Sequence, residues 1–265
     1  MTYDFSSEEQ CKLACAKNGH NLEYVEQQTY ELCKIACAQN GYALQYVLHQ
    51  TEELCKIACA RYGEALQYVE QQTYELCKIA CSQDGRALRY VNEQSYELCK
   101  IACAQNGYAL QHVRYQTEEL CKIACEQNGN VIVYVREQTK DICKVACAQD
   151  GEALEYVREQ TEELCKIACA QDGNVLRYVR KQTPDICKIA CAQDGYALCY
   201  CDHITSECFA LVSKDCLEEL YSTLSKRRRM RVRELALARA NWNVFVNGTR
   251  NMLCADIHNH IKRFL

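Results

Sequence analysis

Apolar residues follow a helical rhythm along this chain, and the rhythm restarts every 22 residues. Between Thr29 and Gln50, a first apolar group covers an arc of roughly 200° on a helical wheel and a second covers roughly 160°. The first group is Leu32, Cys33, Ile35, Ala36 and Cys37, and the second is Ala43, Leu44, Tyr46 and Val47. The wider arc predicts a helix that packs on more than one side, and the narrower arc predicts a second, shorter helix.

Residues that begin and end helices flank the two apolar groups. Thr29 precedes an acidic first turn at Glu31, which is typical of a helix N-cap, and Pro184 occupies the first helical position in another copy of the pattern. Asn40 and Gly41 then predict that the first helix ends in left-handed backbone. Each 22-residue segment is therefore predicted to be a helical hairpin.

The hairpin pattern occurs nine times without an insertion or a deletion. A Cys-Lys-x-Ala-Cys motif and a glycine keep a constant register in all copies. The glycines are Gly19, Gly41, Gly63, Gly85, Gly107, Gly129, Gly151, Gly173 and Gly195. Repetition at this period predicts an all-α fold, an α-solenoid of nine 22-residue helical-hairpin repeats with a helical C-terminal cap.

The repeats divide the chain into three parts. Residues 1–6 are a lead-in, residues 7–204 form the nine-repeat solenoid, and residues 205–265 form a degenerate tenth repeat and a basic helical C-terminal cap. The tenth copy begins at Thr205 but has Phe209 and Ser213 at the two cysteine positions. A solenoid needs a divergent end of this kind, because its last repeat would otherwise expose an apolar flank.

The repeat motif A-x-x-x-x-G-x-A-L-x-Y-V-x-x-Q-T-x-E-L-C, found here from Ala36 to Cys55, resembles a known family of helical repeats. That family, whose function is unknown, occurs in large DNA viruses of amoebae and in amoeba-associated bacteria. The resemblance covers residues 7–204 and implies a helical-repeat fold without implying an activity. The family often has Val or Ala at the second cysteine position, so the doubled cysteine is a departure from it.

Cysteine is unusually frequent, with 23 copies in 265 residues. The N-terminus resembles no secretory signal and no apolar run is long enough to span a bilayer, so a cytoplasmic protein without a membrane partner is expected. For a viral protein, the expected location is the host cytoplasm or the virion. Thiols stay reduced in the cytosol, so most of these cysteines are predicted to be free.

The paired cysteines of each repeat, such as Cys33 and Cys37, are one helical turn apart and lie inside the apolar arc. Core packing is the favoured interpretation, because free cysteine packs as a small apolar residue. Zinc ligation between neighbouring repeats and redox-linked crosslinking are the two alternatives.

Two less repetitive clusters are further candidates for zinc, although a structural role is favoured for both and no cofactor is predicted. Cys201 occupies a position that is valine in other repeats, whereas Cys199 occupies an outward position. The first cluster is Cys199, Cys201, His203 and Cys208, and the second is Cys254, Asp256, His258 and His260.

Candidate binding residues lie on the polar side of the pattern. The position after the repeat valine reads Glu26, Leu48, Glu70 and Asn92 and then becomes arginine in four successive repeats. These arginines are Arg114, Arg136, Arg158 and Arg180. A ladder of guanidinium groups offers forked donors to carboxylates or phosphates, while a merely solvated face, neutralised by acids such as Glu137, is the favoured alternative.

Charge is distributed unevenly between the repeats and the tail. Residues 1–205 carry 20 basic and 29 acidic side chains, and residues 206–265 carry 11 basic and 6 acidic ones. A basic segment in the tail consists of Lys226, Arg227, Arg228, Arg229, Arg231 and Arg233. A helical end cap is its favoured role, with nuclear targeting or nucleic-acid contact as the alternative.

No catalytic motif is present: the chain has no glycine-rich phosphate loop, no G-x-S-x-G and no H-E-x-x-H. The favoured function is therefore a non-enzymatic scaffold that mediates protein-protein interaction. Two alternatives are a structural component of a large DNA virus particle and a nucleic-acid-associated protein that acts through its basic C-terminal segment.

Overall fold

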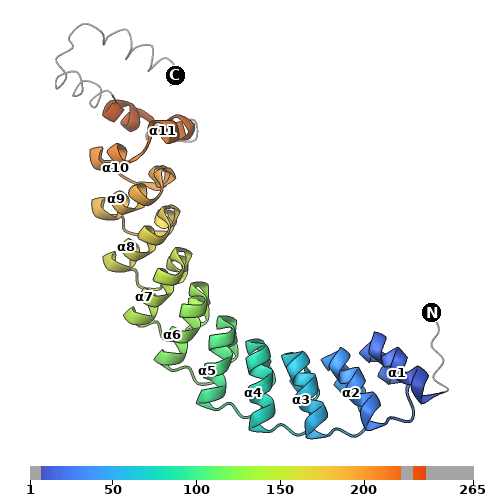
Figure 1. Ribbon diagram of the computed structural model, residues 1–265. Helices are drawn as coiled ribbons and strands as arrows, with labels where there is room; N and C mark the ends of the chain where they lie inside the picture. The colour runs from blue at the N-terminus through green and yellow to red at the C-terminus, as the bar shows by residue number, and fades with distance from the viewer. Residues whose placement is uncertain (1–6, 222–228, 237–265) are drawn as a thin grey trace, which may run out of the picture. The chain divides into compact units, whose positions relative to one another are not determined.

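The computed structural model describes residues 7–221 and 229–236, and the regular secondary structure in these ranges is entirely helical (Figure 1). Each predicted hairpin is present as an α-helix followed by a 3-10 helix, which confirms the all-α repeat architecture. Within the described ranges, no helix combines the length and apolar character that crossing a bilayer requires.

The α-helices of the nine repeats begin where the sequence predicts. In each one, the side chain of a Ser or Thr N-cap accepts a hydrogen bond from the backbone three residues later, as Thr29 Oγ1 does from Leu32 N at 3.4 Å. The helices are α1 (Glu8–Lys17), α2 (Tyr30–Gln39), α3 (Glu52–Arg61), α4 (Tyr74–Gln83), α5 (Tyr96–Gln105), α6 (Glu118–Gln127), α7 (Lys140–Gln149), α8 (Glu162–Gln171) and α9 (Pro184–Gln193).

The second helix of each hairpin is a tight 3-10 helix of six residues. Asn40 connects the preceding α-helix to η2 and has an extended conformation (φ −145°, ψ 113°). Its Oδ1 atom accepts a hydrogen bond from Tyr42 N at 3.0 Å. The 3-10 helices are η1 (Gly19–Tyr24), η2 (Gly41–Tyr46), η3 (Gly63–Tyr68), η4 (Gly85–Tyr90), η5 (Gly107–His112), η6 (Gly129–Tyr134), η7 (Gly151–Tyr156), η8 (Gly173–Tyr178) and η9 (Gly195–Tyr200).

The prediction of a left-handed stop at Asn40 and Gly41 is wrong, because Asn40 is extended and Gly41 is the first residue of a 3-10 helix. The glycine is required for a different reason. A Cβ atom built on Gly107 would lie 2.6 Å from the carbonyl oxygen of Ala124 in the next repeat. Seven glycines meet an alanine carbonyl of the next repeat in this way at 2.8 Å or less, so no side chain fits there.

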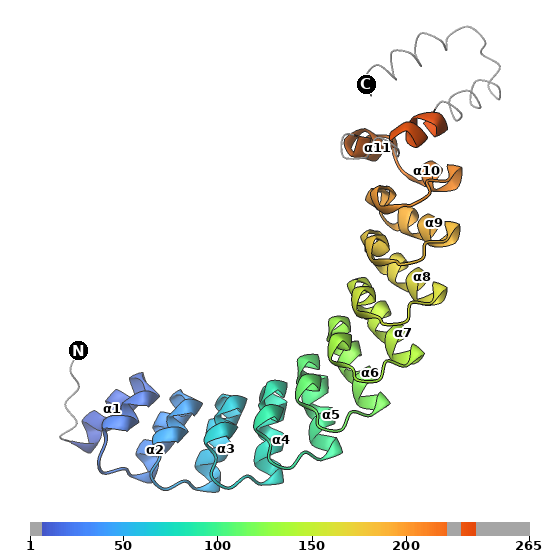
Figure 2. The same cartoon turned by 180° about the vertical axis from the view of Figure 1, so that it is seen from behind.

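The chain forms two compact blocks, residues 1–146 and residues 147–265, with the boundary inside α7. Within each block the repeats stack in chain order, as Figure 1 and Figure 2 both show. Consecutive α-helices such as α2 and α3 pack together, and consecutive 3-10 helices such as η3 and η4 form a second layer. Stacking of this kind, in which each repeat contacts its sequence neighbours, defines an α-solenoid.

The core of each block lies between these two layers. In the second repeat, Leu32, Ala36, Cys37 and Leu44 are at most 1% exposed, whereas Ile35 is only half-buried. The eighteen cysteines of the nine repeats are all buried free thiols. Their position agrees with the core-packing interpretation, since each thiol fills the space of a small apolar side chain.

Glutamine side chains tie the backbones of successive repeats together. Gln28 Nε2 donates to the carbonyl of Tyr46 at 2.8 Å, while Gln28 Oε1 accepts from the backbone N–H of Leu48 at 3.0 Å. A second glutamine, Gln39, accepts from the backbone N–H of Gly19 at 2.7 Å. These bonds satisfy backbone groups that the short helices leave unpaired.

A divergent helical segment covers the ninth repeat within the second block. Helix α10 (Ser206–Leu211) packs on α9 and η9, and α11 (Lys214–Tyr221) packs on η9. Phe209, at the first cysteine position, is buried, as are Val212 and Leu220. Residues 229–236 are also helical, and Arg231 Nε donates to the carbonyl of Ile204 at 3.3 Å.

Replacing Gly107 with alanine tests the close approach of the backbones. Because the added methyl group would meet the carbonyl of Ala124 and Gln127 Oε1, we expect the free energy of unfolding to fall by about 3 kcal/mol. Urea denaturation followed by circular dichroism measures the effect. Gly195→Ala is a matched control, because its methyl group would meet side chains of Val212 and Cys216 that can move, so its effect should be smaller. Equal effects of the two substitutions would contradict this explanation.

The buried thiols predict how stability depends on pH. Burial raises the pKa of Cys37, Cys59, Cys81 and Cys103 to about 12 each, from an ordinary value of 9.0. The folded chain therefore holds these protons at a pH where the unfolded chain has lost them, so stability is complete below about pH 8 and falls between about pH 9 and pH 12. Thermal unfolding across this range measures the slope. Replacing the cysteines at the second position of three repeats with alanine should make the slope shallower; an unchanged slope would contradict the assignment.

Candidate partner-binding edge

The variable position after the repeat valine lies in the turn that leaves each 3-10 helix. Its backbone is fixed even though its side chain varies, because its N–H group donates to the glutamine of the preceding repeat. Leu48 N donates to Gln28 Oε1 and Arg136 N donates to Gln116 Oε1, both at 3.0 Å. Within each block, the turns of successive repeats therefore form a regular edge, which we call the turn edge. The side chain at this position is Glu, Leu or Asn in the first four repeats and Arg in the next four.

The arginines on this edge use their forked guanidinium groups within the protein. Arg136 Nη1 donates to the carbonyl of Arg114 at 2.7 Å, and Arg136 Nη2 donates to the carbonyl of Val113 at 3.2 Å. Arg114 makes the equivalent bonds to Asn92 and Val91, and in the second block Arg180 makes them to Arg158 and Val157. Each of these arginines thus lies back along the edge and ties two successive turns together.

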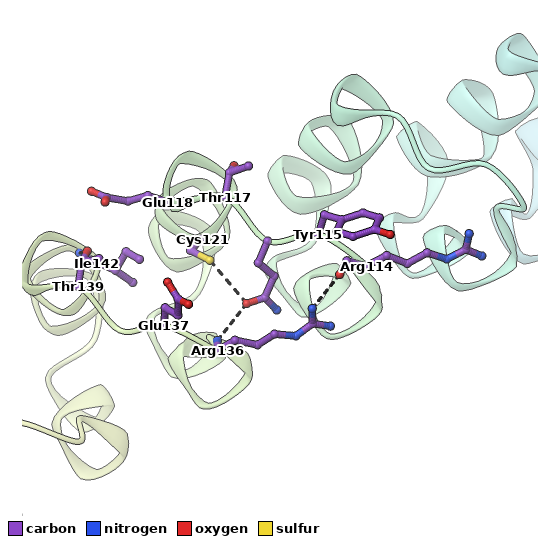
Figure 3. A pocket seen from close by; sticks show the side chains of 10 residues that line it. Arg114, Tyr115, Thr117, Glu118, Cys121, Arg136, Glu137, Thr139 and Ile142 are labelled. Carbon is purple, nitrogen blue, oxygen red and sulfur yellow. Dashed lines mark hydrogen bonds between the residues drawn. The ribbon is translucent and has the colours of Figure 1, made fainter.

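A pocket of about 360 Å³ opens on the turn edge of the first block (Figure 3). The turn from Arg114 to Thr117 forms one wall, and residues of the next turn, from Arg136 to Thr139, form the other. Cys121 lies at its base, with its Sγ 3.8 Å from Gln116 Oε1. Tyr115 is 87% exposed at its rim, the most exposed large apolar side chain in the described residues. The lining residues include two arginines and two glutamates, so the pocket carries both signs of charge.

A second pocket, of about 520 Å³, occurs in the same register two repeats earlier. It is lined by Gln72, Thr73 and Cys77 where the first has Gln116, Thr117 and Cys121. Asn92 stands in this pocket where the first pocket has Arg136. The charge of the lining therefore differs, while the glutamine, threonine and cysteine positions are the same. The turn edge therefore repeats a pocket at equivalent positions with changing chemistry.

The four residues of the first candidate metal cluster differ in burial. Cys201 and Cys208 are buried, Cys199 is half-buried and His203 is exposed, so the four do not share one site. Among the described residues, no three histidine, cysteine or acidic side chains are arranged to hold a metal ion. The second candidate cluster, Cys254, Asp256, His258 and His260, lies outside the described residues.

The basic segment is described only in part. Arg229, Arg231 and Arg233 are exposed, and Arg231 Nη1 forms an ion pair with Glu234 at 3.0 Å. Lys226, Arg227 and Arg228 lie outside the described residues. The observed contacts of Arg231 are with the protein's own chain, at Ile204 and Glu234.

The fold and the turn edge place this chain in the structural class of α-helical repeat proteins. No protein-family model, curated protein or solved structure matches the chain. Assignment of its role therefore depends on the chemistry of its own surface.

Two features of the edge do not follow from the repeat pattern alone. The glutamine clamp carries a sequence signal, since glutamine recurs before the N-cap Thr or Ser from Gln28 to Gln182. Tyr115 carries a weaker signal, because it stands where other repeats have Gln27, His49 or Glu93. Neither signal indicates which backbone groups or pocket the side chain would meet.

Removing the Arg136 side chain tests whether the arginines stabilise the stack. Arg136→Ala loses two hydrogen bonds to carbonyls of the preceding repeat, and we expect the free energy of unfolding to fall by about 1 kcal/mol at this exposed site. Chemical denaturation measures the change. Leu48→Ala alters the same position in the second repeat, where the side chain is 64% exposed, and should have no effect. An Arg136→Ala variant as stable as the parent would show that the arginine bonds contribute nothing to the stack.

Proposed function

We propose that this protein is a non-enzymatic scaffold whose turn edge binds an extended segment of a partner protein. The recurrence of a pocket at equivalent positions along the edge of the first block is the observation that supports the proposal most directly. An extended peptide presents side chains at regular intervals, and a surface with regularly spaced pockets suits such a ligand.

The division between constant and variable positions supports the same function. Positions that face the core repeat almost unchanged, whereas the two positions after the repeat valine vary widely along the edge. At the pocket these positions hold Arg114 and Tyr115, and the next repeat supplies Arg136. Tyrosine and arginine are among the residue types enriched at energetic hot spots of protein interfaces.

Tyr115 is the residue that we expect to anchor the partner. Its ring is 87% exposed and makes no hydrogen bond with the part of the chain that the structure describes, so Tyr115→Ala should weaken binding without altering the fold. Linear peptides selected by phage display against the full-length chain serve as probes, and their affinity for purified variants is measured by fluorescence anisotropy. We expect Tyr115→Ala to weaken binding about tenfold or more, which corresponds to the loss of one hot-spot residue.

Tyr30→Ala is the matched control. Tyr30 is also exposed but does not line the pocket, so this substitution should leave peptide affinity unchanged. Equal affinity of the parent and Tyr115→Ala would place the binding surface elsewhere. Failure to select peptides, together with salt-dependent retention of the chain on DNA, would favour the nucleic-acid alternative instead.

A further inference from the structure

The two pockets of the turn edge each join a tyrosine ring to a glutamate carboxylate. The first pocket is lined by Tyr115 and Glu137, and the second is lined by Tyr74 and Glu93. Glu93 and Glu137 occupy the same position of two repeats, the second position after the repeat valine. Both tyrosines are exposed, Tyr115 at 87% and Tyr74 at 52%. A ligand that enters either pocket therefore meets an aromatic side chain and an acidic one.

The carboxylates of Glu93 and Glu137 are available to a ligand. Both side chains are exposed, and neither forms a hydrogen bond or an ion pair with the residues that the structure describes. Glu118, the other glutamate of the first pocket, differs because its carboxylate pairs with Lys122 Nζ at 2.6 Å. One unengaged carboxylate thus remains in each pocket.

The arginines of the first pocket are directed toward the preceding turns. Arg136 Nη1 and Nη2 donate to backbone carbonyls of the preceding repeat at 2.7 Å and 3.2 Å. Figure 3 shows the guanidinium group of Arg114 pointing away from Glu137. The second pocket has Asn92 in place of an arginine, so Glu93 is the one charged residue in its lining. The charge that is not already engaged within the protein is therefore negative in both pockets.

The overall charge of the repeats also favours a basic ligand. Residues 1–205 carry 20 basic and 29 acidic side chains. A surplus of acids attracts a cationic segment and speeds its association. A carboxylate beside a tyrosine ring suits the guanidinium group of arginine, because this group forms two parallel hydrogen bonds with a carboxylate and stacks on aromatic rings. Charge and local chemistry thus favour the same kind of partner.

We propose that the turn edge of the first block recognises a basic segment of its partner protein, with one arginine of that segment in each pocket. Recognition of this kind rests on the proposed function, because it specifies the chemistry of the same partner. In each pocket the guanidinium group donates to the carboxylate of Glu93 or Glu137, and its flat face lies against the tyrosine ring.

The register of the pockets sets the spacing of the two arginines in the partner. The pockets lie two repeats apart within the first block. Stacked helices pack about 8–10 Å apart, so two repeats separate the pockets by roughly 16–20 Å. An extended chain advances about 3.3–3.6 Å per residue, so the two arginines should stand about five or six positions apart.

Linear peptides selected by phage display against the full-length chain test the proposal. We expect the selected peptides to contain two arginines about five or six positions apart. Synthetic copies in which one arginine is replaced by glutamine should bind about tenfold more weakly, because a charge-assisted pair of hydrogen bonds is lost. Fluorescence anisotropy measures the affinity of each peptide.

Glu93→Gln and Glu137→Gln remove the two carboxylates with little change in side-chain size. Each substitution should weaken binding of the two-arginine peptide about tenfold, and each should lose its effect on the peptide in which the matching arginine is glutamine. Glu31→Gln is the matched control, because Glu31 is exposed and lines neither pocket. This control changes the net charge equally and should leave affinity unchanged.

Peptides that bind the turn edge without a basic residue, identified by their weaker binding to Tyr115→Ala, would overturn the basic partner and leave the proposed function intact. Equal weakening by Glu31→Gln and the two pocket variants would also overturn it, because overall charge would then explain the preference. Self-association of the chain that the peptides displace would assign the pockets to a second copy instead. Failure to select any peptide would count against the proposed function itself, and against the basic partner with it.

Discussion

The contact between a glycine backbone and an alanine carbonyl of the next repeat is the constraint on which this structure depends. A Cβ atom on Gly107 would lie only 2.6 Å from Ala124 O. The two repeats therefore approach as closely as their backbones permit. The close approach also lets the N–H of Gly107 donate a hydrogen bond to Gln127 Oε1 at 2.7 Å. Without this bond, the tight turn would leave the buried N–H group without an acceptor. Close packing and hydrogen bonding of each repeat therefore depend on the same atoms of the next one.

This constraint explains why the repeats tolerate no change in length. A repeat in the interior of a block contributes a glycine to one neighbour and an alanine carbonyl to the other, and the glutamine clamp adds backbone bonds 18 and 20 residues away. An inserted residue would break the register of both contacts at once. Variation is confined to side chains that leave these contacts intact, and the turn edge is where such side chains gather.

The sequence predicts most of the fold because the signals involved are local. Thr29 and Pro184 mark helix starts by their own chemistry, and the positions of Leu32 and Cys37 on the helical wheel indicate the core. The role of Gly41 was misjudged, since glycine after asparagine has the same local appearance whether it permits left-handed backbone or a close approach. The bonds of Arg136 and Gln28 join residues 18 to 23 positions apart, and no local pattern indicates such partners.

The same reasoning separates two kinds of position in this molecule. The turn edge is built from positions that the stack leaves unconstrained, so its composition can change from Asn92 to Arg136 while the surrounding lining residues stay the same. The core positions are ones that the stack does constrain, and they change where the next repeat is no longer regular. There Cys201 replaces the repeat valine, Cys208 replaces the repeat leucine or isoleucine, and Phe209 takes the place of a repeat cysteine. A core substitution at an end is tolerated because it alters a single interface instead of a pattern shared by every repeat.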